Sequence, residues 1–119
     1  MTKIYLIRHA EAEGNLYRRI QGHWDGSITA LGLQQIDALA QRFRHEHIDA
    51  LYCSNLSRAR VTAEAITRYH DVPAVATPRL AEICMGVWEG RAWGDVEHEF
   101  PEQMRYFNTD PEKWSVPGG

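Results

Sequence analysis

Residues 4–15 combine side-chain types that can bind a phosphoryl group and attack it. An apolar run ends at Arg8 and His9, and small and polar residues then lead to Asn15. Arginine can bind phosphoryl oxygens through two parallel hydrogen bonds, and histidine is a nucleophile and a base near neutral pH. An isolated Arg-His pair is more often a solvated strand end followed by a loop histidine. The interpretation therefore depends on the rest of the chain.

Strands and helices alternate in the predicted order of elements. The short segments rich in β-branched, aromatic or other apolar residues, which predict strands, are residues 3–8, 50–53 and 72–77. The segments with apolar residues at helical spacing, which predict helices, are residues 29–45, 56–69 and 93–107. Thr29 suits the N-cap of the first helix, and Pro101 interrupts the last. Residues 16–28 and 110–119 are predicted to be loops.

This order predicts an α/β fold with a mainly parallel sheet, because strand–helix–strand units form right-handed crossovers. Ligands of such sheets bind outside the carboxyl ends of the strands. Arg8 and His9 end the first predicted strand, residues 54–58 follow the second, and residues 79–82 follow the third. We therefore expect these three segments to converge at one edge of the sheet.

Four stretches of the chain carry a family resemblance. They are Arg8-His9-Ala10-Glu11 with Asn15, Gln21-Gly22 with residues 25–32, residues 54–63, and residues 80–90. In this order they resemble the motifs of the histidine phosphatase superfamily, the phosphoglycerate mutase-like enzymes. The resemblance implies a three-layer αβα architecture around a mainly parallel sheet. Ala10 stands where the family usually has glycine, which is tolerable if the backbone there is not left-handed.

The resemblance further implies that the chain is the N-terminal part of a longer protein. Family members continue beyond the position of Gly119 into another helix, another strand and a second catalytic histidine. None of the remaining histidines has that context: His23, His45, His47, His70 and His98. We therefore expect residues 1–119 to form a single histidine-phosphatase-like domain that is incomplete at its C-terminal side.

The resemblance assigns catalytic roles to four residues. His9 would attack phosphorus and form a phosphohistidine, while its other ring nitrogen donates to a backbone carbonyl. Arg8 and Arg58 would neutralise the phosphoryl charge. Glu82, at the acid–base position, would protonate the leaving alkoxide, with a pKa raised by apolar neighbours. Without the resemblance, Glu82 would be interpreted as a solvated loop carboxylate that competes with others in the chain.

Several further groups are expected around the phosphate. Asn15, Gln21 and the amide of Gly22 are predicted to contact phosphate or substrate oxygens. The amides that open the helix at 56–69 are predicted to face the anion as well. A group of aromatic residues either lines a pocket or packs over the sheet: Trp88, Trp93, Tyr106, Phe107 and Trp114.

Composition and charge exclude several other classes of function. A net charge of −3 argues against a nucleic-acid partner, and the apolar runs are too short to cross a membrane. Two cysteines without a secretion signal favour a cytoplasmic protein with reduced thiols. The triplet at 45–47 is not a predicted metal site, because alternate residues of a helix face apart. We expect neither a metal nor an organic cofactor.

Three functions remain open at this point. The leading one is a phosphatase that hydrolyses small phosphate monoesters through a phosphohistidine. A phosphoglycerate mutase would use the same residues, but residues 90–119 lack the longer insertion that the family's mutases carry there. A module that binds a phosphate ligand without turnover is the third, because the second histidine is absent. The sequence identifies neither the ester nor the oligomeric state, and a homodimer stays open.

Overall fold

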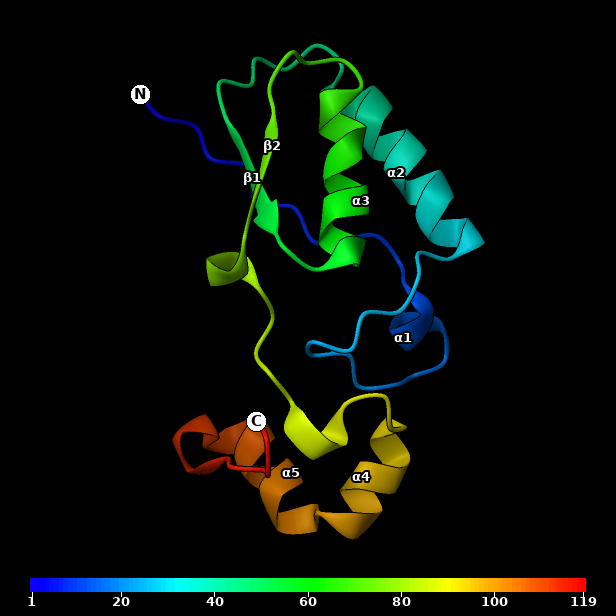
Figure 1. Ribbon diagram of the computed structural model, residues 1–119, viewed down its shortest axis with the longest axis vertical. Coiled ribbons are helices and arrows are strands. Elements are labelled where there is room, and N and C mark those ends of the chain that lie inside the picture. Colours follow the sequence, from blue (N-terminus) through cyan, green and yellow to red (C-terminus); the bar gives the residue numbers. More distant parts are fainter.

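The computed structural model describes residues 1–119, and Figure 1 shows a strand-containing part joined to a helical part. The strands are β1 (Leu51–Ser54) and β2 (Ala74–Thr77). The α-helices are α1 (Glu13–Leu16), α2 (Ala30–Phe43), α3 (Ser57–Thr67), α4 (Trp93–Glu99) and α5 (Pro101–Thr109). Three short 3-10 helices complete the list: η1 (Pro78–Leu80), η2 (Gly86–Trp88) and η3 (Pro111–Lys113). No helix is both long and apolar enough to cross a membrane.

The sheet consists of β1 and β2, which pair in parallel with Leu51 opposite Ala74 and Ser54 opposite Thr77. Helix α3 connects the two strands and packs on them, and α2 packs against α3. The α/β class and the parallel pairing are thus confirmed. On the sheet's outer side, the side chains of Tyr52 and Val75 are exposed.

The predicted helices are confirmed with small shifts of their ends. The side chain of Thr29 accepts a hydrogen bond from the amide of Gly32 at 3.1 Å, so Thr29 is the N-cap of α2 as expected. The predicted helix at 93–107 is divided into α4 and α5 at Phe100, directly before Pro101. A proline cannot supply the amide hydrogen bond that would continue α4.

The prediction of a strand at residues 3–8 is wrong for this chain. These residues pair with no other strand, and the side chains of Ile4 and Leu6 are 84% and 99% exposed. The segment runs beside β1, but a cavity of about 430 Å³ lies between Tyr5–His9 and the strand. Paired strands lie about 4.8 Å apart. The segment therefore has a strand-like sequence, but no other strand lies close enough to pair with it.

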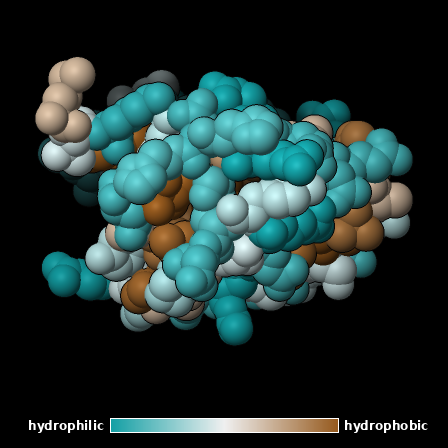
Figure 2. All heavy atoms as spheres, turned by 90° about the horizontal axis from the view of Figure 1, so that it is seen from above, coloured by the Kyte–Doolittle hydropathy of each residue, from teal (hydrophilic) through white to brown (hydrophobic).

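Four of the five aromatic residues that the sequence analysis named form a core, and Tyr106 is the exception. Trp88 is completely buried, and its ring lies 5.6 Å from that of Trp114 and 6.0 Å from that of Phe107. Trp93 also packs against this cluster, which belongs to the helical part. Packing, rather than a pocket lining, is therefore the role of these rings, and it anchors the loop that follows η1. Figure 2 shows that the opposite end of the molecule is mostly hydrophilic, with apolar atoms between the polar side chains.

Glu46 holds the N-terminal segment to the end of α2. Its carboxylate accepts hydrogen bonds from the hydroxyl of Tyr5, from Arg42 at 2.9 Å and from Lys3 at 3.4 Å. The ring of Tyr5 packs edge-on against Phe43, with ring centres 4.9 Å apart. The hydrogen bonds from Tyr5 and Arg42 lower the pKa of Glu46 to about 2.

This contact predicts a pH-dependent stability. Because folding lowers the pKa of Glu46, its stabilising effect is complete above the unfolded-state value of about 4.3. The effect is lost as the pH falls towards the folded-state value of about 2. We expect Glu46→Gln to lower the urea midpoint at pH 7, and the difference from wild type to shrink as the solution is acidified. A difference that persists unchanged at pH 2 would show that the carboxylate charge is not its cause.

Candidate active site

His9 has one ring nitrogen bound to the backbone and the other free of protein contacts. Its Nδ1 lies 2.7 Å from the carbonyl oxygen of Ala10, and because a carbonyl only accepts, Nδ1 carries the proton. In the neutral ring Nε2 then keeps its lone pair, and the predicted backbone contact is present. Burial lowers the pKa of His9, and the positive charges of Arg58 and Arg8 lower it further, against the opposing effect of the Ala10 carbonyl. A neutral ring is the form that a nucleophile requires.

Thr62 fixes the backbone next to His9. The amide of Ala10 donates to Oγ1 of Thr62 at 2.9 Å, and this hydroxyl donates to the carbonyl of Arg58 at 2.7 Å. Both Ala10 and Thr62 are buried. The backbone of Ala10 is not left-handed, since Arg18 alone among the non-glycine residues has a positive φ. Alanine in place of the family's glycine is therefore accommodated without backbone strain, as expected.

Arg58 is a buried cation bound to the loop at 22–25. Its guanidinium, 3% exposed, donates to the carbonyls of Gly22 at 2.7 Å and Trp24 at 3.1 Å. The carboxylate of Asp25 lies 3.6 Å from the same group. The loop thus fixes the orientation of an arginine that lines the same cavity as His9.

The N-terminus of α3 has a protein partner of its own. The carboxylate of Asp25 accepts the amide of Ser57 at 2.5 Å and that of Arg58 at 3.4 Å. The prediction that these amides face a ligand anion is therefore wrong, because a carboxylate of the same chain already binds them. Asp25 instead joins the loop at 22–25 to the first turn of α3.

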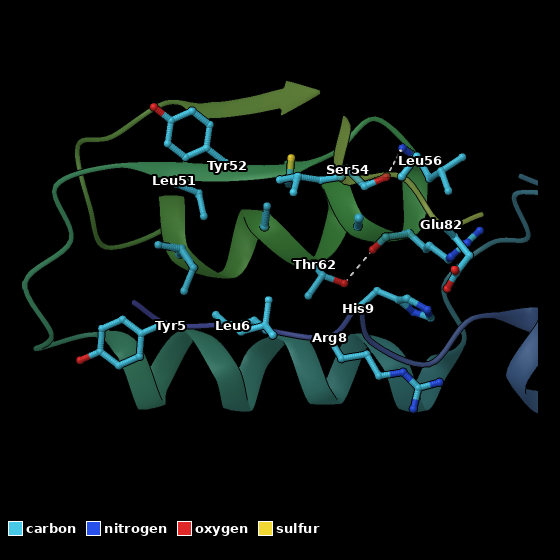
Figure 3. A pocket seen from close by; sticks show the side chains of 18 of the residues that line it. Tyr5, Leu6, Arg8, His9, Leu51, Tyr52, Ser54, Leu56, Thr62 and Glu82 are labelled. Carbon is cyan, nitrogen blue, oxygen red and sulfur yellow. Dashed lines mark hydrogen bonds between the residues drawn. The ribbon is translucent and has the colours of Figure 1, made fainter. Parts of the chain in front are cut away.

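Glu82 reaches the same end of the cavity from the segment after η1. Figure 3 shows the side chains of Arg8, His9 and Glu82 at this end. Glu82 is exposed, and its carboxylate accepts the amide of Ile83 at 2.9 Å. The expectation of apolar surroundings was wrong, because the aromatic residues that follow it pack in the helical part.

The predicted convergence of three segments is confirmed. The cavity has a polar and charged end, and its remaining lining is mostly apolar. The polar or charged residues at or near that end are Arg8, His9, Ser54, Arg58, Thr62 and Glu82. They come from the N-terminal segment, the β1–α3 region and the segment after η1. The structure therefore brings an imidazole, two guanidinium groups and a carboxyl group to one place.

Asn15, Gln21 and Gly22 do not line the cavity. The side-chain oxygen of Asn15 accepts the amide of Ala12 at 3.0 Å and, more weakly, Nε2 of Gln21 at 3.4 Å. The other side-chain atom of Gln21, Oε1, is buried without a hydrogen-bond partner. The carbonyl of Gly22 is bound by Arg58. Their contact with a substrate stays a prediction.

Sequence reasoning missed four residues that support the site: Asp25, Thr62, His23 and Glu89. Thr62 had a signal, because it lies four residues after Arg58 and so shares its helix face. Asp25 precedes α3 by a long stretch of chain, and no local pattern predicts its contact. His23 and Glu89 are 66 residues apart, and their hydrogen bond is set by the fold alone. No group of three His, Cys, Asp or Glu side chains is placed to hold a metal ion.

Residues 4–119 match the sequence model of the histidine phosphatase superfamily (branch 1). The chain belongs to this superfamily. It is 35% identical over 119 residues to phosphoserine phosphatase 1 of Hydrogenobacter thermophilus, covering 100% of this chain and 56% of that protein. It is 43% identical over 125 residues to the probable phosphoglycerate mutase GpmB of Photorhabdus laumondii, covering 100% of this chain and 53% of that protein.

Other similar proteins extend this comparison. Adenosylcobalamin/alpha-ribazole phosphatase of Salmonella typhimurium is 36% identical over 108 residues, covering 91% of this chain and 54% of that protein. The solved structure of Bacillus stearothermophilus YhfR superimposes with a TM-score of 0.85 at 31% identity, covering 92% of this chain and 54% of that one. The chain thus spans about half the length of the relatives it matches.

The hydroxyl of Thr62 provides a test of how the backbone at His9 is held. Thr62→Val keeps the shape of the side chain but leaves the buried amide of Ala10 without an acceptor, which costs about 1–3 kcal/mol of unfolding free energy. Thr62→Ser keeps the hydroxyl and serves as the matched control, with a smaller loss. Urea unfolding measures both variants. A valine variant as stable as the serine variant would contradict the importance of this hydrogen bond.

Proposed function

We propose that the whole protein is a phosphatase that hydrolyses small phosphate monoesters through a phosphohistidine formed on His9. The observation that carries this proposal is the state of His9, whose Nδ1 is bound to the Ala10 carbonyl while Nε2 is free. This nitrogen belongs to a side chain that lines one cavity with Arg58 and Glu82. The phosphatases among the similar proteins support the same chemistry.

The reaction proceeds in two displacements at phosphorus. Arg8 and Arg58 bind the phosphoryl oxygens and neutralise their charge, which is most of what phosphoryl transfer requires. Nε2 of His9 forms a bond to phosphorus as the ester P–O bond breaks, and Glu82 gives its proton to the leaving alkoxide. Water then attacks the phosphohistidine, the Glu82 carboxylate takes a proton from that water, and the P–N bond breaks. Phosphate leaves, and both residues return to their starting states.

Asn15, Gln21 and Gly22 are proposed contacts for substrate oxygens. Asn15 uses its side-chain oxygen within the chain, so its Nδ2 is available as a donor. The amide of Gly22 donates to no protein acceptor. Both groups border the loop that binds Arg58, which is the support for placing the rest of the substrate on this side.

We further propose that residues 1–119 belong to one histidine phosphatase domain, since the superfamily match covers residues 4–119. A cytoplasmic location is supported by two free cysteines, Cys53 and Cys84. The proposed partner is a small phosphorylated molecule. Assembly into a homodimer stays a prediction for sedimentation analysis.

A phosphoglycerate mutase is the second candidate, because a probable mutase is among the similar proteins. Both activities begin with the same attack by His9. They differ in whether water or a substrate hydroxyl accepts the phosphoryl group. Glu82 is exposed, and this access to water favours hydrolysis.

Trapping the phosphoenzyme tests the proposal. We expect the full-length protein, quenched during turnover of a ³²P-labelled phosphate monoester, to carry acid-labile label, and His9→Ala to carry none. Because the pKa of His9 lies below its ordinary value of about 6.5, the ring stays neutral as the pH falls through 6.5. Labelling should therefore decline only at lower pH. Acid-labile label that persists on His9→Ala would overturn the assignment.

A further inference from the structure

The carboxylate of Glu89 joins two loops on either side of the site. Its Oε1 accepts the amide of His23 at 2.8 Å and the amide of Met85 at 2.9 Å. The ring of His23 continues this connection, because its Nε2 lies 2.7 Å from the carbonyl oxygen of Glu82. A carbonyl only accepts, so Nε2 of His23 carries the proton and donates it.

Glu89 is itself held firmly in place. It directly follows Trp88, which is completely buried in the aromatic core, and Met85 is buried as well. Gly22 has a φ of +52°, and a Cβ at this position would lie 2.5 Å from Oε1 of Glu89. The close approach of loop and carboxylate thus needs a glycine. Desolvation raises the pKa of Glu89, but the amide hydrogen bonds from His23 and Met85 outweigh it and keep the group ionised.

Glu82, in contrast, has few contacts that could position it. The side chain is exposed, and its carboxylate bonds only to the neighbouring amide of Ile83. The hydrogen bond from His23 to its carbonyl is the one that joins it to a distant segment. The loop that carries His23 also binds the guanidinium of Arg58 through the carbonyls of Gly22 and Trp24. The loop at 22–24 therefore forms hydrogen bonds with both the proposed acid and the proposed phosphate-binding arginine.

We propose that Glu89 is a positioning residue that fixes the backbone of Glu82 relative to Arg58 and His9 by clamping the loop at 22–24. Glu89 does not line the cavity and touches no reacting group. It acts through His23 and through the amide of Met85. This inference rests on the proposed function, in which Glu82 is the proton donor.

The test compares two substrates in the full-length protein. Glycerol phosphate has an alkoxide leaving group that needs a proton, whereas 4-nitrophenyl phosphate has an acidic leaving group that needs it much less. Glu89→Ala removes the acceptor of both amides, and we expect kcat/KM to fall about tenfold more for the alkyl ester than for the aryl ester. Glu89→Gln keeps an oxygen acceptor and should restore the ratio to within about threefold of wild type. Glu97→Ala changes an exposed residue of α4 that does not line the cavity, so this matched control should leave the ratio unchanged.

Glu82→Gln separates failure of this inference from failure of the proposed function. If this variant lowers kcat/KM equally for both substrates, Glu82 is not the acid. If Glu82→Gln lowers kcat/KM selectively for the alkyl ester while Glu89→Ala lowers it equally for both substrates, or for neither, the positioning role is overturned. If Glu82 is the acid and Glu89 positions it, the variant that combines Glu82→Gln with Glu89→Ala shows no alkyl-selective loss of kcat/KM beyond that of Glu82→Gln alone. Should Glu89→Ala fail to fold, His23→Ala, which removes only the ring contact to Glu82, must show the same selectivity, and an unchanged ratio overturns the proposal.

Discussion

The buried charge of Arg58 is the constraint on which the rest of the site depends. An arginine that is 3% exposed is stable only if its donors and its charge are paired within the protein. The carbonyls of Gly22 and Trp24 and the carboxylate of Asp25 meet this requirement, which fixes their loop against α3. One turn further along α3, Thr62 binds the backbone next to His9. A single helix thereby sets the positions of the proposed nucleophile and of the proposed phosphate-binding cation.

The parts of this arrangement that follow from local patterns could be predicted from the sequence. Alternating strands and helices predicted that segments ending in Arg8-His9, Arg58 and Glu82 meet at one edge, and they line one cavity. The N-cap of α2 at Thr29 could likewise be predicted, because it depends only on residues of the same turn. The lack of strand pairing at residues 3–8 could not be predicted from the sequence. Pairing depends on a neighbouring strand, and this segment has none at the spacing of paired strands. The hydrogen bond between Glu89 and His23 spans 66 residues, so no periodicity or cap signal reports it.

The two ends of the cavity differ in chemistry, and this difference bears on function. The apolar remainder lies between the N-terminal segment and β1, whereas the charged end opens next to exposed Glu82. The proposed hydrolysis and the alternative phosphoryl transfer would share the attack by His9 and separate only at the acceptor. The contacts of Asp25, Thr62 and Glu89 would serve either proposed chemistry, because both need the same geometry at phosphorus.

The most direct measurement is a crystal structure of the full-length protein with vanadate, which mimics the trigonal phosphoryl group in transfer. We expect vanadium bonded to Nε2 of His9, with its oxygens within hydrogen-bond distance of Arg58 and Arg8, and Nδ1 still bound to the Ala10 carbonyl. Vanadate bonded to another side chain, or bound away from Arg58, would contradict the claim that this edge of the sheet is where phosphoryl transfer takes place.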